Sequence, residues 1–127
     1  RMRNAFGNDI KILCGVDTLA LEELILGADG WVAGLVDAFP RETVVIYELV
    51  QQNRIEEARE IYRWFMPLLE LDIHPKLVQN IKLAEVATGI GTENVRPPRL
   101  SLVGDERKRV QKIIDEALAV RPEMPKI

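Results

Sequence analysis

Cysteine, histidine and long apolar runs are nearly absent from this chain, and each absence excludes a class of protein. The one cysteine, Cys14, excludes an internal disulfide and suits a reducing cytoplasm, which is the expected location. Cys14 and the one histidine, His74, have no metal-ligand spacing, so we expect neither a metal nor a cofactor. No apolar run approaches the roughly 20 residues of a membrane span, and no signal peptide pattern is present.

A strong excess of basic or of acidic residues is lacking as well. The chain has 17 basic and 20 acidic residues, a net charge of −3, which gives no electrostatic case for nucleic acid or a membrane as partner. The basic run at residues 107–109 lies between Asp105 and Asp115, which indicates a solvated helix face. A hydrophobic content of 47% is ordinary for a globular domain.

Two short strand-to-loop segments near the start of the chain are its most informative feature. They cover residues 10–17 and 27–34, with strands expected at 10–14 and 31–36. Residues 18–26 between them predict a helix, capped by Asp17 or Thr18. Strand, helix and strand in this order predict a βαβ unit and a parallel sheet. Because two strands cannot form a covered parallel sheet, we expect the end of a larger domain.

The rest of the chain predicts helices. Residues 43–52 and 55–71 form the first two, with Pro40 in a first turn and Pro67 kinking or splitting the second. A third helix covers residues 76–88 and ends at Gly89. After an extended connector, residues 106–120 form a fourth helix with Asp105 as its cap. The apolar face of the earlier helix at residues 18–26 is expected to point inward through these side chains: Leu19, Leu21, Leu24 and Ile25.

This order of elements predicts an α/β fold, namely the C-terminal portion of a TIM (β/α)8 barrel. Residues 1–52 would supply its last two βα units, and residues 53–127 a C-terminal helical extension. A full barrel takes about 250 residues, so roughly half of the domain would lie outside this chain. Lys11 is the only lysine on a predicted strand, and its place near the strand start indicates a peripheral, solvated side chain.

A family resemblance appears in patterns that surround both predicted strands. They read LCGVD at residues 13–17 and GADGWVAGLVD at residues 27–37. Further matches are NRIEEAR at residues 53–59, MPL at 66–68, the helix at 76–89 and VRPP at 95–98. In this order and spacing the chain resembles the dihydrodipicolinate synthase / N-acetylneuraminate lyase family, over nearly its whole length.

The resemblance implies class I lyase chemistry, in which a lysine forms a Schiff base with a 2-oxo acid such as pyruvate. In the family that lysine lies on the sixth barrel strand, upstream of the segment matched here. The resemblance therefore implies no catalytic residue in this chain, an inactive fragment by itself, and a homotetramer for the full-length enzyme. The partners it implies are the 2-oxo acid and the missing N-terminal half of the barrel.

What this segment would contribute is pocket wall. The resemblance places Gly15 and Asp17 at the substrate site, Val32 with its main-chain carbonyl toward the reacting carbon, and Thr18 and Gly34 at the distal part of the substrate. The residues also allow plainer readings. The two glycines suit backbone turns, and Asp17 suits a helix cap. Both readings stay open at the level of sequence.

Departures from the family pattern bear on the reaction. Val16 stands where synthases often have a second acidic residue, Ala33 and Gly34 replace a hydroxyl-bearing step, and Asp37 replaces a common asparagine. Condensation, aldol cleavage, dehydration and deamination all use the same imine, so the exact reaction stays open. Two other readings also remain: a non-catalytic helical interaction module, and a half-barrel that pairs with a second chain.

Overall fold

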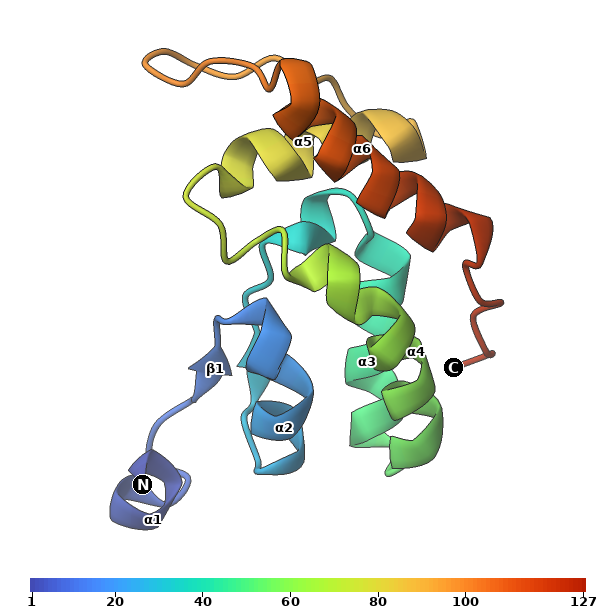
Figure 1. Cartoon of the computed structure of the whole chain (residues 1–127). Helices are drawn as coiled ribbons and strands as arrows, with labels where there is room; N and C mark the ends of the chain where they lie inside the picture. The colour runs from blue at the N-terminus through green and yellow to red at the C-terminus, as the bar shows by residue number, and fades with distance from the viewer.

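The computed structural model describes residues 1–127 and shows a small α/β chain that is mostly helical. Its elements in chain order are α1 (Met2–Phe6), β1 (Leu13–Cys14), the 3₁₀ helix η1 (Asp17–Leu19), α2 (Ala20–Ile25), β2 (Gly30–Trp31), the 3₁₀ helix η2 (Leu35–Asp37), α3 (Pro40–Gln51), α4 (Ile55–Leu69), α5 (Leu77–Thr88) and α6 (Gly104–Ala119). The strands and α1 to α4 form one part of the molecule, and α5 and α6 lie across its end (Figure 1).

The sheet consists of two short parallel strands. Leu13 pairs with Gly30 and Cys14 with Trp31, and α2 connects the strands, so the predicted βαβ unit is confirmed. Both strands are shorter than predicted. The second ends at Trp31 because the chain turns into η2, where the backbone N–H groups of Gly34 and Leu35 donate to the Asp17 carboxylate instead of to a neighbouring strand.

The entry to α2 corrects two predictions. The predicted cap by Asp17 or Thr18 is wrong, because no side chain caps η1 or α2 and the Asp17 carboxylate faces the segment after β2. The predicted inward position of Leu19 and Ile25 is also wrong, since they are 50% and 49% exposed. The 3₁₀ turn rotates the helix face, and Ala20 is buried instead, beside the correctly predicted Leu21 and Leu24.

The boundaries of the later helices follow their proline and glycine residues in most places. Pro40 begins α3, as predicted, and Gly89 ends α5 in the left-handed conformation at φ 75°. Pro67 neither splits nor ends α4, because it lies in the last turn before Leu69. Asp105 is not a cap: α6 begins one residue earlier, at Gly104, without a side-chain capping bond.

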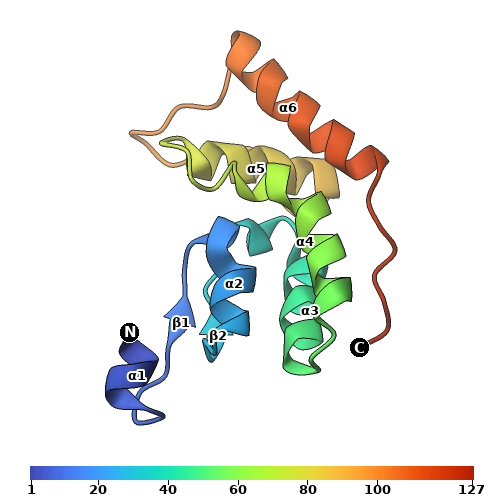
Figure 2. The same cartoon turned by 60° about the horizontal axis from the view of Figure 1, so that its bottom comes forward.

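An aromatic cluster at the junction of α3, α4 and α6 forms the centre of the core. Phe39 and Phe65 are fully buried and meet edge to face with centroids 5.4 Å apart, and Trp64 stacks on Phe65 at 5.5 Å. The Trp64 indole Nε1–H also donates to the Ala117 carbonyl oxygen at 2.9 Å, which fixes α6 against α4. Figure 2 shows α5 and α6 above the ends of α3 and α4. None of the helices has the length and apolar character that crossing a bilayer requires.

Candidate functional site

The carboxyl ends of β1 and β2 bring two loops together at one edge of the sheet. The loop after β1 runs through Gly15 to Thr18, and the loop after β2 runs from Val32 to Leu35. The strands are parallel and in register, so both loops leave the sheet on the same side. In α/β folds this edge is where ligands bind, and it is therefore the first candidate site.

Asp17 joins the two loops. Its side chain is fully buried, and its carboxylate accepts the indole Nε1–H of Trp31 at 2.9 Å, the N–H of Gly34 at 3.2 Å and the N–H of Leu35 at 2.9 Å. The Asp17 backbone is held too, because the Tyr62 hydroxyl donates to its carbonyl oxygen at 2.6 Å. A buried carboxylate with this many donors is well satisfied without a ligand.

Sequence reasoning missed the roles of Trp31 and Tyr62. Tyr62 is 3% exposed on α4, and burial raises the pKa of its hydroxyl to about 12. The hydroxyl therefore stays protonated and keeps donating to Asp17. Both contacts join residues that are 14 and 45 positions apart, so no local pattern could have revealed them. The only signal in the sequence was that Tyr62 stands among the apolar positions of its helix, where a buried hydroxyl needs a hydrogen-bond partner.

Gly34 lies between two carboxylates, and the second one was not predicted. A Cβ atom built on Gly34 would lie 2.2 Å from Asp72 Oδ1 and 2.7 Å from its Cγ, so the Asp72 side chain packs directly on the Gly34 backbone. Asp72 comes from the turn after α4. Burial, and then the nearby Asp17 charge, raise the pKa of Asp72 above its ordinary value. A side chain at position 34 would therefore have to displace Asp72, whereas the φ of −81° is open to any residue.

The other predicted site residues lie around this contact. Val32 is 63% exposed, and its N–H donates to the Cys14 carbonyl oxygen at 2.9 Å, which extends the sheet contact by one bond. Gly15 is exposed with nothing within 4 Å of a Cβ, and Thr18 is half-buried on η1. The structure thus brings Asp17 and Gly34 into direct contact and leaves Gly15 and Val32 open. Substrate contacts by these residues stay predictions.

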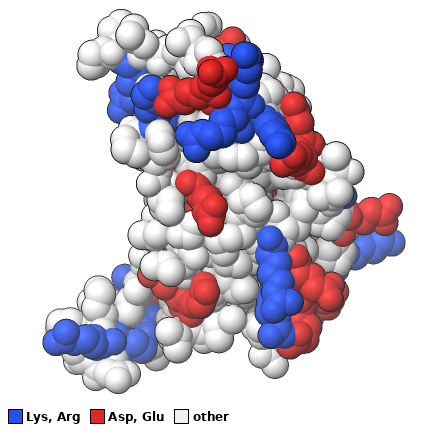
Figure 3. Space-filling model, viewed as in Figure 1, with Lys and Arg blue, Asp and Glu red and all other residues white.

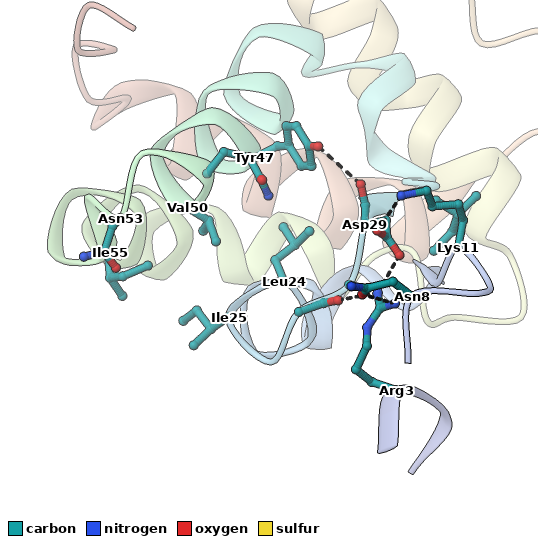
Figure 4. A pocket seen from close by; sticks show the side chains of 14 residues that line it. Arg3, Asn8, Lys11, Leu24, Ile25, Asp29, Tyr47, Val50, Asn53 and Ile55 are labelled. Carbon is teal, nitrogen blue, oxygen red and sulfur yellow. Dashed lines mark hydrogen bonds and ion pairs between the residues drawn. The ribbon is translucent and has the colours of Figure 1, made fainter. Parts of the chain in front are cut away.

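The opposite edge of the sheet has its own polar centre, at Asp29. The Asp29 carboxylate accepts the N–H of Ile12 at 2.8 Å and pairs with Arg3 at 2.5 Å and with the exposed Lys11 at 3.2 Å. The Ile12 N–H and the Arg3 guanidinium hold the pKa of Asp29 well below its usual range. Figure 4 shows these side chains in an open cavity of ≈ 870 Å³ with Tyr47, whose hydroxyl donates to the Asp29 carbonyl oxygen.

This large cavity is not the candidate site, because none of the five predicted site residues lines it. It borders the amino ends of the strands and the side of α2, and its two cations, Arg3 and Lys11, both pair with the one carboxylate of Asp29. A second cavity, of ≈ 490 Å³, does include Gly15, together with Cys14 and Glu23. Both cavities are wide open to solvent, as expected for surfaces that lack a covering layer.

Cys14 has no features of a reactive thiol. It is 4% exposed, and its Sγ donates to the Gly30 carbonyl oxygen at 3.2 Å. Burial, and then the Glu23 charge, raise the pKa of the Cys14 thiol to about 11. The chain also has no group of three or more His, Cys, Asp or Glu side chains placed to hold a metal ion.

Charged side chains on the outer surface pair with one another. Lys76 contacts Glu106 at 2.6 Å and Arg107 contacts Glu93 at 3.1 Å, which ties α6 to the segments on either side of α5. Figure 3 shows basic and acidic groups next to each other over α5 and α6. The hydrogen bond from the Lys76 ammonium lowers the pKa of the Glu106 carboxyl group.

Comparisons with known proteins show which family this chain matches. The model of the Dihydrodipicolinate synthetase family matches residues 1–117. An uncharacterized DapA-like lyase of Thermococcus kodakarensis is 30% identical over 112 residues, which are 87% of this chain and 38% of that protein. Across the curated relatives it matches, the chain spans between 31% and 39% of their length.

Solved structures agree on the fold. Dihydrodipicolinate synthase from Aquifex aeolicus superposes with a TM-score of 0.80 at 20% identity, over 91% of this chain and 39% of that one. A variant of the 2-keto-3-deoxygluconate aldolase of Sulfolobus solfataricus gives a TM-score of 0.75 at 22% identity, over 93% of this chain and 41% of that one. On the family match, which extends over nearly its whole length, the chain belongs to the dihydrodipicolinate synthetase family.

Proposed function

We propose that this chain is the C-terminal part of a Schiff-base-forming lyase or synthase that acts on a 2-oxo acid of the pyruvate type. In this proposal residues 1–52 are the last two βα units of a TIM barrel and residues 53–127 its helical extension. The rest of the barrel supplies the lysine that forms the imine, and the complete protein assembles as a homo-oligomer. The chain alone is inactive.

One observation supports the proposal most: two parallel strands that end together in glycine-containing loops, on a fragment that superposes on barrel enzymes of the family. Exposed apolar side chains border the strands, among them Leu13 at 60% and Val32 at 63%. Side chains of this kind are buried inside a closed barrel. The remaining strands would therefore cover surfaces that are open in this chain.

In the proposed reaction the lysine amine adds to the 2-oxo carbonyl and releases water, and the protonated imine then accepts electrons from the adjacent carbon. This chain would contribute the wall of the pocket and no covalent step. Gly15 lines the substrate site beside Asp17, the Val32 carbonyl oxygen is offered to the reacting region, and Thr18 and Gly34 lie at the distal part of the substrate. Val16, Ala33 and Asp37 leave condensation, aldol cleavage, dehydration and deamination as candidate reactions.

Borohydride trapping with pyruvate tests the proposal. The chain is produced alone and together with the complementary barrel segment, each is treated with pyruvate and borohydride, and intact masses are measured. We expect a pyruvate-sized adduct only in the complete barrel, on a lysine outside this chain. Peptide mapping should leave Lys11 unmodified. An adduct on the chain alone, or none on a folded complete barrel, would contradict the proposal.

A further inference from the structure

The Asp17 side chain has no surface left with which to contact a ligand. It is 0% exposed, and three donors from the end of β2 and the segment after it converge on its two oxygens: Trp31 Nε1–H at 2.9 Å, Gly34 N–H at 3.2 Å and Leu35 N–H at 2.9 Å. Each of these bonds spans 14 to 18 positions in the chain. The carboxylate therefore fixes one loop of the sheet edge onto the other.

The extension holds Asp17 from the other side. Tyr62, on the buried face of helix α4, donates its hydroxyl to the Asp17 carbonyl oxygen at 2.6 Å. Because burial raises the pKa of this hydroxyl to about 12, it stays protonated and able to donate at neutral pH. A continuous path of hydrogen bonds thus runs from α4 through Asp17 to Gly34 and Leu35.

The loop at the end of this path is the open part of the site. Val32 donates its N–H to the Cys14 carbonyl oxygen, and no turn or loop hydrogen bond ends on the carbonyl oxygens of Val32 and Ala33. Gly34, two residues on, is held between Asp17 and the Asp72 side chain. The free carbonyl groups are therefore carried by a segment whose two ends are both fixed.

We propose that Asp17 is a positioning residue and not a substrate contact: it holds the loop of residues 32–35 in place, and Tyr62 couples that loop to the helical extension. The inference rests on the proposed function for its meaning in the reaction, but its geometry is independent of that function. It makes the extension part of the site, since α4 sets the position of the loop that follows β2.

Hydrogen exchange tests the geometry in the chain itself. Asp17→Asn keeps the shape of the side chain but replaces one of its two acceptor oxygens with an NH₂ group. The three donors, Trp31 Nε1–H, Gly34 N–H and Leu35 N–H, can then no longer all be accepted, and the one oxygen that remains is uncharged and a weaker acceptor. We expect exchange in a peptide covering residues 32–36 to become about tenfold faster or more. The matched control is Asp37→Asn, an exposed acidic residue on η2, next to the peptide that is measured. Equal exchange in the two variants would overturn the proposal.

Tyr62→Phe separates the two halves of the path, because it removes only the bond to the Asp17 carbonyl oxygen. We expect faster exchange in a peptide covering residues 16–20, together with a smaller increase in residues 32–36. An increase confined to residues around position 62 would mean that α4 does not control the loop.

Kinetics of the complete barrel test the role in the reaction. If Asp17 positions the loop, Asp17→Asn should leave trapping of the pyruvate imine intact and lower kcat by about tenfold or more, with little change in the KM for pyruvate. A higher KM at unchanged kcat would indicate direct substrate contact and overturn the inference. If the wild-type barrel traps no imine, the proposed function fails, while the exchange results still decide the positioning of the loop.

Discussion

At Gly34 a single backbone position separates two carboxylates. Asp17 accepts its N–H, and Asp72 Oδ1 occupies the space where a Cβ would stand, 2.2 Å away. The φ of −81° is open to any residue, so the requirement for glycine comes from contact and not from backbone strain. The effect of a methyl group here therefore measures how firmly Asp72 is held.

Gly34→Ala should destabilise the fold by about 1–3 kcal/mol, because the new methyl displaces the short Asp72 side chain. Asp72→Ala should remove most of that cost in the double variant, which a double-mutant cycle by urea unfolding would detect. The control is Gly15→Ala, where nothing lies within 4 Å of a Cβ, and we expect a change below about 0.5 kcal/mol. Additive effects of Gly34→Ala and Asp72→Ala would argue against the contact.

The reactivity of the Cys14 thiol and its dependence on pH test whether this side chain is buried. With the thiol pKa raised to about 11, only about one thiol in a thousand is ionised at pH 8, so alkylation by iodoacetamide should be slow in the folded chain and fast in urea. The raised folded pKa favours the neutral thiol. Its stabilising effect is therefore present below the unfolded value of 9.0 and is lost as pH rises toward about 11. Rapid alkylation without denaturant would contradict the buried position.

Residue-level prediction from the sequence worked where chemistry is local. Pro40 and Gly89 mark helix ends through their own backbone preferences, and both positions are confirmed. Asp17 shows where such reasoning stops. Its carboxylate was free to cap the next helix, yet it binds donors from a loop 17 and 18 positions away, which depends on how the strands pair. The sequence could nominate the residue but not its partners.

At the scale of elements, the end of α6 is fixed to the start of α3 by a charge pair. Glu42 is fully buried, Arg121 donates Nε–H to its Oε1 at 2.6 Å, and the guanidinium lies 5.6 Å from the centre of the Phe39 ring. The second carboxylate oxygen of Glu42 has no partner. The buried charge of Glu42 on α3 is therefore neutralised by a single arginine, Arg121, which follows α6.

Arg121→Ala should lower the free energy of unfolding by about 1–3 kcal/mol, since it leaves the buried Glu42 carboxylate unpaired. The upper end of the usual cost is not expected, because the Arg121 side chain is 40% exposed and screened by solvent. Urea unfolding at fixed protein concentration measures the change. Arg41→Ala, an exposed neighbour of Glu42 on α3, is the control. Equal effects of the two substitutions would show that the pair adds nothing.

Prediction of the secondary-structure elements failed for the strands, because the length of a strand depends on the strand that it pairs with. The second strand was expected to reach Val36 because residues 31–36 are mostly apolar, but a strand exists only as far as it is paired. Here β2 has one partner, β1, and η2 begins at Leu35 once Asp17 has taken the backbone donors. The helices could be predicted more closely, because their hydrogen bonds lie within each segment.

At the scale of the whole molecule, the strand side of the chain has an apolar surface without cover. Leu13 and Val32 are 60% and 63% exposed beside a sheet of two strands. Open strand edges with apolar neighbours promote association. We therefore expect the isolated chain to oligomerise or aggregate, and to become a defined species only with the complementary part of the barrel.

Light scattering coupled to size-exclusion chromatography checks this expectation against the chain mass of 14.4 kDa. Leu13→Lys combined with Val32→Lys should reduce association of the isolated chain and also weaken its binding to the complementary barrel segment, because both use the same strand surface. Leu100→Lys is the matched control: Leu100 is 81% exposed, but it lies in the connector before α6, away from the strands. A monodisperse wild-type monomer with a cooperative melt would instead favour an independent helical interaction module. Association lost equally in all the lysine variants would place the contact surface elsewhere than on the strands.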